Sequence, residues 1–170
     1  MKKIFVVLIF ITSSVFAISP EENIEASKED KFLWLKQRIK CEIVVKTGNG
    51  DAKECIKSAD MILALKGKKL DANDIPKNIE EKAAESFHNA GVIYTDRLDY
   101  KNAIIMYEKA AKLKLPSALN NLGYIYAHGL GVPENYTKAF KYWKEASALG
   151  NENAQQSLQA LCSKNSWACK

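Results

Sequence analysis

The sequence predicts an all-α protein built from stacked helical hairpins, with a separate helical hairpin at its N-terminal end. Apolar residues recur at helical spacing in its long segments, and no strand pattern appears beyond residue 76. In addition, Ala103 recurs as Ala139, 36 positions later, as part of a longer set of small and aromatic residues. A period of this length is typical of a repeat array, in which neighbouring units bury each other's apolar faces.

Residues 1–17 have the layout of a secretory signal peptide. Two lysines form a basic start, residues 4–11 are uninterrupted apolar, and Ala17 ends a small-residue cleavage site. The apolar run is too short to span a bilayer. We expect a bacterial mature chain from about Ile18, periplasmic or secreted and without a stable membrane anchor. A retained N-terminal anchor is the alternative.

The net charge of the chain is too small to indicate a nucleic-acid partner. It falls from +5 to +3 when the two leader lysines are removed, and no block of Lys or Arg or RNA-binding signature is present. We therefore expect no nucleic-acid partner.

Residues 18–75 are predicted to form the N-terminal hairpin. Its first helix covers residues 29–46. The apolar residues at helical spacing in this helix are Phe32, Leu35, Ile39 and Ile43. The glycines of "TGNGD" then favour a turn. Asp51 can cap the second helix, residues 52–66.

Four cysteines lie downstream of the leader: Cys41, Cys55, Cys162 and Cys169. An even number in an oxidising compartment indicates two disulfides, for which three pairings exist. We expect the local pairing, Cys41–Cys55 and Cys162–Cys169. The first bridge would contribute on the order of 3 kcal/mol by restricting the unfolded chain. A zinc site would need closer Cys/His spacing, so no metal or cofactor is predicted.

Residues 76–170 are predicted to hold two helix-pair repeats, a capping helix and a tail. Between the two units the correspondences are Tyr107 with Trp143, Ala110 with Ala146, Ala118 with Ala154, Leu122 with Leu158, Gly91 with Gly123, and Tyr94 with Tyr126. The small residues would let paired helices approach closely, and the aromatic residues would fill the space between them. The glycine-rich "GLGVP" lacks the preceding strand and third glycine of a dinucleotide-binding loop, so we expect an inter-helix loop.

These residues resemble a known family. "FHNAGVIYTDRLDYKNAIIMYEKA" is similar to a tetratricopeptide repeat. The segment from Ala118 to Leu158 resembles a Sel-1-like repeat, the longer-loop branch of the same superfamily. The resemblance covers about residues 83–160, roughly half of the mature chain, and implies an α-solenoid that binds a protein or peptide. A structural module acting through its convex face is a further alternative.

One branch of Sel-1-like proteins, exported and rich in cysteine, implies a competing function, β-lactam hydrolysis or penicillin binding. That branch places a cysteine pair within each helix pair, near the positions of Ala146 and Ala154. This chain has no cysteine there, and it lacks a Ser-x-x-Lys nucleophile motif. The sequence therefore favours a protein that is not an enzyme, with a β-lactamase-type hydrolase as the alternative, and no catalytic residue is predicted.

First helices line the concave surface of tetratricopeptide-like arrays, so the resemblance also implies a groove. Aligning the first helices of the two units predicts these partner-binding residues: His88, Val92, Thr95, Asn120, Tyr124 and His128.

The tail "LCSKNSWACK" is predicted to cover the end of the stack. The last helix should span residues 151–162, with Ala154, Leu158 and Leu161 at helical spacing. A bridge from Cys169 to Cys162 would press Trp167 onto the exposed end, because terminal repeats need a cap.

The leader generates the first testable prediction. Cleavage near Ala17 should leave a secreted chain that begins at about Ile18. Edman sequencing of protein recovered from the producing cells checks this, and a mature N-terminus at Met1 would refute it.

Overall fold

The computed structural model describes residues 28–48, 50–66 and 78–169, which form α-helices and one short 3₁₀ helix, with no strand among them. The predicted leader and most of the connector after residue 66 lie outside the described residues. The elements are α1 (Lys28–Thr47), α2 (Lys53–Leu63), α3 (Ile79–Asp96), α4 (Tyr100–Lys112), α5 (Pro116–His128), α6 (Tyr136–Ala148), α7 (Glu152–Lys164) and the 3₁₀ helix η1 (Ser166–Cys169). This confirms the predicted all-α class.

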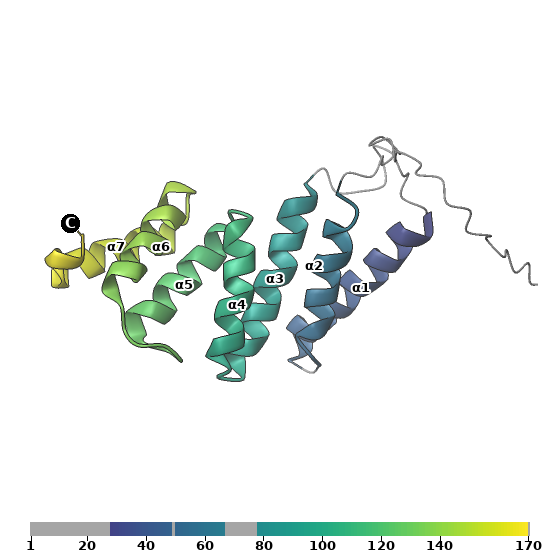
Figure 1. Cartoon of the computed structure of the whole chain (residues 1–170), viewed down its shortest axis with the longest axis horizontal. Helices are drawn as coiled ribbons and strands as arrows, with labels where there is room; N and C mark the ends of the chain where they lie inside the picture. The colour runs from purple at the N-terminus through teal and green to yellow at the C-terminus, as the bar shows by residue number, and fades with distance from the viewer. Residues whose placement is uncertain (1–27, 49, 67–77, 170) are drawn as a thin grey trace, which may run out of the picture.

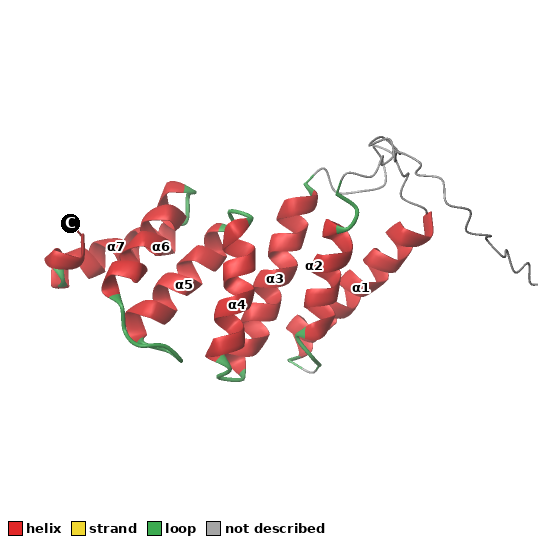
Figure 2. Ribbon diagram, in the orientation of Figure 1, coloured by secondary structure: helices red, strands yellow, loops and turns green. Residues whose placement is uncertain are grey.

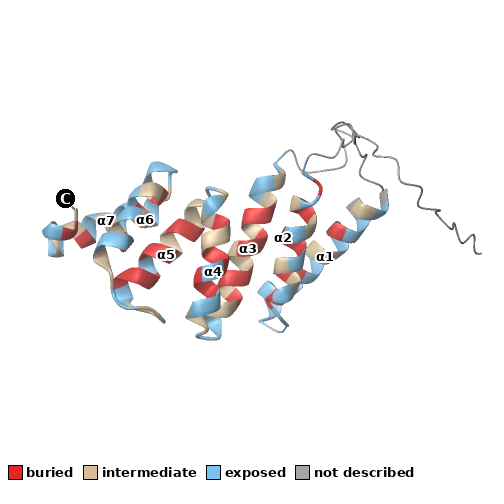
Figure 3. Ribbon diagram, viewed as in Figure 1, coloured by how far each residue is buried: buried red, intermediate tan, exposed pale blue. Residues whose placement is uncertain are grey.

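The helices form one continuous stack, each packed against the next in sequence (Figure 1 and Figure 2). The pairs α1/α2, α3/α4 and α5/α6 are hairpins, and α7 follows α6. The buried residues lie along the middle of the stack, between successive helices (Figure 3). The N-terminal hairpin continues this stack, because α2 packs against α3 as well as against α1.

Four of the helices begin with the same capping interaction. The side chains of Asn78, Asp99, Asn135 and Asn151 each accept a hydrogen bond from the backbone N–H three residues later. Such a side chain pairs one of the amides that the first helical turn leaves without a partner. These caps therefore set where α3, α4, α6 and α7 start. Helix α5 instead has Pro116 in its first turn, where no amide hydrogen bond is lost.

Within each repeat, a glycine of the first helix meets an aromatic ring of the second. A Cβ on Gly91 would lie 2.5 Å from Cε1 of Tyr107, and one on Gly123 would lie 2.5 Å from Nε1 of Trp143. Both rings are nearly buried, at 2% and 5% exposure. The small and aromatic residues thus have the roles predicted for them.

The "GLGVP" segment is the loop between α5 and α6. Gly129 ends α5 in the left-handed conformation, with φ 61°, and Gly131 also has a positive φ of 68°. A Cβ on Gly131 would lie 2.6 Å from the Cβ of Tyr100, at the start of α4. The second glycine is therefore explained by close packing against the preceding unit, and no strand precedes the loop.

A disulfide joins the two helices of the N-terminal hairpin. Cys41 and Cys55 form the predicted bridge, and both side chains are almost fully buried. Gln37 donates hydrogen bonds to the backbone and side-chain oxygens of Glu54, at 3.0 and 2.8 Å. Asp51 accepts from the N–H of Lys53, the first residue of α2. This hydrogen bond holds the pKa of Asp51 below its usual value.

The apolar residues that predicted the first helix lie on its exposed side. Phe32, Leu35, Ile39 and Ile43 are all exposed, between 47% and 69%. The buried side is instead formed by Trp34, Cys41 and Val44. The bridge from Cys41 to α2 requires this orientation, because a side chain on the opposite face of α1 could not reach Cys55.

The tail contains the predicted Cys162–Cys169 bridge, but Trp167 does not cover the end of the stack. Its indole is 62% exposed and meets the ring of Tyr136 edge-on, with centroids 6.1 Å apart. Ala168 is the buried residue of η1. The prediction was wrong because the short 3₁₀ turn directs the small neighbouring side chain inward.

The contact between glycine and aromatic ring leads to a stability prediction. Replacing Gly123 with Ala should lower the free energy of unfolding by about 1–3 kcal/mol, because the Trp143 ring must move out of a filled core. This change should outweigh the gain in helix propensity, about 1 kcal/mol. Urea denaturation followed by circular dichroism measures the effect. Gln156→Ala, on the exposed side of α7, is the control and should change stability little. An unchanged or more stable Gly123→Ala protein would contradict the packing argument.

The two disulfides should differ in their effects on stability. Replacing Cys41 and Cys55 with Ser should lower the free energy of unfolding by about 3 kcal/mol, since that bridge closes the longer loop and lies in the core. The same change at Cys162 and Cys169 should cost less, because the bridge spans seven positions at the end of the stack. Denaturation of both double variants tests the order, and a larger loss from the C-terminal pair would reverse it.

Candidate partner-binding surface

One face of the stack is formed by the odd-numbered helices. Besides its partner in the hairpin, α1 also contacts α3, and α5 also contacts α7. His88 on α3 also lies within hydrogen-bonding distance of Asn121 on α5, so α1, α3, α5 and α7 form one row along this face of the stack. The predicted binding residues lie on α3 and α5, so their positions can be compared directly with the surface of this row.

Two hollows open along this row. The one between α3 and α5 has a volume of 230 Å³, and it is lined by Val92, Thr95, Asp96, Tyr107, Asn121, Tyr124, Ile125 and Leu130. The one between α1 and α3 has a volume of 180 Å³, and it is lined by Val44, Val45, Gly48, Val92, Ile93, Asp96 and Arg97. Val92 and Asp96 line both. The two hollows therefore adjoin each other at Val92 and Asp96, and we call the pair the α1–α3–α5 groove.

Three of the six predicted binding residues line this groove: Val92, Thr95 and Tyr124. Thr95 Oγ1 bonds to the backbone oxygen of Gly91 at 2.9 Å and lies 3.1 Å from the hydroxyl of Tyr107. Tyr124 is 52% exposed, so much of its ring is open to a ligand.

The two histidines lie beside the groove rather than in its lining. His88 lies 5.6 Å from the ring of Tyr107, between centroids, and its Nε2 is 3.2 Å from Nδ2 of Asn121. His128 is exposed at the end of α5 and packs on Tyr124, with ring centroids 4.1 Å apart. Its Nδ1–H donates to the Tyr124 carbonyl at 2.9 Å. His88 therefore links α3 to α5, and His128 supports the exposed tyrosine.

Asn120 is oriented toward the core. Its backbone carbonyl accepts a hydrogen bond from the indole N–H of Trp143 on α6, at 3.2 Å, and its side-chain oxygen is buried. The neighbouring Asn121 lines the groove instead. The asparagine of α5 that lines the groove is therefore Asn121, which was not among the predicted residues.

Sequence reasoning also missed Asp96, Tyr107 and Leu130. Tyr107 was predicted to fill the core, and its ring does so, but its hydroxyl end reaches the groove beside Thr95. No sequence signal distinguishes the two ends of that side chain. Asn121 precedes Tyr124 by one helical turn, so the spacing of three could have identified it.

The groove presents apolar and uncharged polar groups beside one carboxylate, Asp96, and one guanidinium, Arg97. Burial lowers the pKa of His88, so its ring is neutral at neutral pH. Burial also raises the pKa of Tyr107, which keeps the hydroxyl protonated. Asp96 is exposed and supplies the negative charge. The hollow between α3 and α5, where Asp96 is the charged residue, suits an uncharged or basic group that offers hydrogen bonds, whereas Arg97 adds a positive charge to the hollow between α1 and α3.

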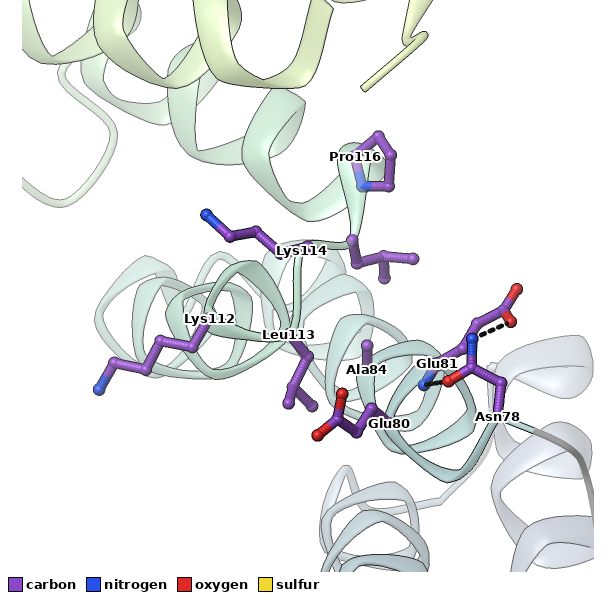
Figure 4. A pocket seen from close by; sticks show the side chains of 9 residues that line it. Asn78, Glu80, Glu81, Ala84, Lys112, Leu113, Lys114 and Pro116 are labelled. Atoms are coloured by element: carbon purple, nitrogen blue, oxygen red, sulfur yellow. Dashed lines mark hydrogen bonds between the residues drawn. The ribbon is translucent and has the colours of Figure 1, made fainter. Parts of the chain in front are cut away.

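A larger hollow, of 430 Å³, lies where the start of α3 meets the turn between α4 and α5 (Figure 4). Its polar groups already have structural roles. Asn78 caps α3 and also donates to Glu81, while Lys114 pairs with Glu145 at 2.7 Å. Glu80 forms an ion pair with Lys66. These contacts explain the charged lining without a ligand, so the α1–α3–α5 groove remains the better candidate.

The described part of the chain contains neither a candidate metal site nor a candidate membrane-spanning helix. No group of three His, Cys, Asp or Glu side chains there could hold a metal ion. Nor does any helix among those residues have the length and apolar character needed to cross a bilayer.

Part of the chain is also similar to known proteins. Over 56 residues, the chain is 38% identical to the HRD3 component of an ERAD-associated E3 ubiquitin-protein ligase from Candida glabrata, covering 33% of this chain and 7% of that protein. Over 73 residues, it is 36% identical to the DAP3-binding cell death enhancer 1 of Rattus norvegicus, covering 42% and 14%. The chain thus spans only a small part of these relatives.

Two solved structures are similar to it. One is a Sel1 repeat protein from Oxalobacter formigenes, with a TM-score of 0.44 and 23% identity, covering 74% of this chain and 98% of that one. The other is a protective antigen of uropathogenic Escherichia coli that displays an SLR fold, with a TM-score of 0.42 and 24% identity, covering 75% and 28%.

The family model described as "Sel1 repeat" matches residues 83–115 and residues 116–151. The first match contains most of α3 and all of α4, and the second contains α5 and α6. Each match is one of the hairpins in which a glycine packs on an aromatic ring. The chain therefore contains two consecutive Sel1 repeats.

Proposed function

We propose that the chain is an exported scaffold that binds an extended segment of a protein or peptide along the α1–α3–α5 groove. The observation that carries this proposal is that the two hollows adjoin, since Val92 and Asp96 line both. Two adjoining hollows that follow three helices suit an extended ligand better than a compact one.

The length of the groove matches that of a short peptide segment. Packed helices lie about 8–10 Å apart, so three successive helices of the row span roughly 20 Å. An extended chain advances about 3.3 Å per residue, and about six residues would cover that distance. Thr95 and Asn121 can bond to the backbone of such a segment, and Asp96 favours a basic side chain.

Tyr124 is the expected anchor of the interface. It is the large, half-exposed aromatic residue of the groove, and its ring is held in place by His128. Tyrosines of this kind often supply much of the binding energy at interfaces, because they bury a large area at a low entropic cost.

Two further observations agree with the proposal. The relative from Rattus norvegicus is named for binding another protein, and the one from Candida glabrata is named as a ligase component. All four cysteines are paired in the structure, which favours an oxidising compartment outside the cytoplasm and is consistent with export.

The test begins with peptides selected from a random display library on the purified protein. Tyr124→Ala should weaken their binding about tenfold or more, as measured by calorimetry, with little change in melting temperature. Trp167→Ala removes an aromatic side chain that is also exposed but lies far from the groove, and it should leave affinity unchanged. Unchanged affinity after replacing both Asn121 and Tyr124 would show that another surface binds the partner.

A further inference from the structure

The outward face of α1 is apolar along most of its length. Phe32 is 69% exposed, Leu35 47%, Ile39 49% and Ile43 52%. Because an α-helix has 3.6 residues per turn, these four side chains form one stripe along α1. The stripe lies opposite Cys41, whose disulfide joins the other face of α1 to α2. We call this row the α1 stripe. An exposed apolar patch of this kind marks a surface that meets another molecule.

At the other end of the stack, the outward face of α7 is polar rather than apolar. The outward positions of α7 include Gln155, Gln156 and Gln159, all exposed and uncharged polar. A polar outer face is what keeps the end of a repeat array soluble. Since one end has this cap and the other does not, the α1 stripe is not simply a consequence of its terminal position.

Basic residues accompany the stripe. Helix α1 contains six basic and three acidic residues. Lys36 follows Phe32 by one helical turn and Lys46 follows Ile43 by three residues, so both border the stripe and both are exposed. Of the acidic residues, Glu42 accepts a hydrogen bond from Arg38 at 3.0 Å. The surface around the stripe is therefore positively charged.

This charge argues against a second copy of the chain as the occupant. If two α1 helices packed antiparallel about a two-fold axis, each flank of the stripe would face the same flank of its partner. Lys36 and Lys40 of one copy would then face the same lysines of the other, and like charges across an interface are unfavourable. The occupant should instead be negatively charged and should accept apolar side chains along a line.

An anionic lipid surface meets both requirements. Apolar side chains of a helix that lies flat on a bilayer enter the boundary between headgroups and acyl chains, while lysines extend to the phosphates. Helix α1 is at the N-terminal end of the stack, so α3 to α7 all lie on one side of it (Figure 1). The side of α1 that faces away from the other helices is exposed (Figure 3). It can therefore approach a flat surface.

We propose that the α1 stripe binds the surface of an anionic lipid bilayer reversibly, with Lys36 and Lys46 contacting the lipid phosphates. This would hold the solenoid with its N-terminal end at the membrane and leave the face of the odd-numbered helices open along its side. The binding is peripheral and requires no membrane-spanning segment.

The test is co-sedimentation of the full chain, as purified from the cells that produce it, with vesicles of phosphatidylglycerol and phosphatidylcholine or of phosphatidylcholine alone. The wild-type protein should bind the anionic vesicles, with at least tenfold weaker binding to neutral ones and a clear loss at high salt. Ile39→Glu should reduce the binding at least fivefold, and Lys36→Glu with Lys46→Glu should do the same. Ile105→Glu, which alters a similarly exposed isoleucine on α4, is the matched control and should bind like the wild type.

Circular dichroism and melting curves of each variant show whether it is folded, and the lysine variant provides a test that leaves the apolar stripe intact. Binding that survives Ile39→Glu, or that falls equally with Ile105→Glu, would overturn the proposal. Absence of binding to anionic vesicles would overturn it as well. If light scattering then shows a dimer that Ile39→Glu dissociates, the occupant is a second copy of the chain.

Discussion

The close contact between a glycine and an aromatic ring underlies the rest of this structure. In each Sel1 repeat the glycine, Gly91 or Gly123, has no side chain to separate the two helices, and the ring of Tyr107 or Trp143 fills the space. Buried alanines on the second helices, such as Ala103 and Ala139, keep the remaining contacts equally short. Since cores are packed to high density, the contact sets both the separation and the rotation of the paired helices. It thereby determines which side chains of α3 and α5 reach the surface.

The same residue connects the core with the candidate site. The ring of Tyr107 lies against Gly91, while its hydroxyl bonds to Thr95 and lines the groove. In the second repeat, Trp143 occupies the equivalent position, and its N–H bonds to the backbone of Asn120 instead. The two repeats share their packing but present different polar groups, so the surface chemistry is specific to each unit although the fold is not.

At the N-terminal end, a covalent constraint replaces the repeat packing. The family match begins at residue 83, yet α1 and α2 continue the stack. The bridge between Cys41 and Cys55 directs Trp34 and Val44 inward and leaves the α1 stripe outside. If α1 were rotated by half a turn, the stripe would be buried and Cys41 could not reach its partner. The disulfide therefore leaves the apolar side chains of the α1 stripe exposed. They are free to contact another molecule, separately from the groove.

The sequence by itself determined the class of fold, the two repeats and the approximate ends of the helices, and it favoured the cysteine pairing that the structure contains, one of three possible pairings. Those features depend on local signals, namely helical periodicity, capping residues, turn glycines and the spacing of cysteines. The tertiary structure decided which face of each helix is buried. Sequence spacing placed Phe32, Leu35, Ile39 and Ile43 on one face but could not show that this face is outside, because α1 also has a second apolar side. It likewise placed Asn120 rather than Asn121 in the groove, and it placed Trp167 rather than Ala168 over the end of the stack. In each case the rotation of an element about its axis is set by contacts with distant residues, and a periodic pattern in one helix does not contain that information.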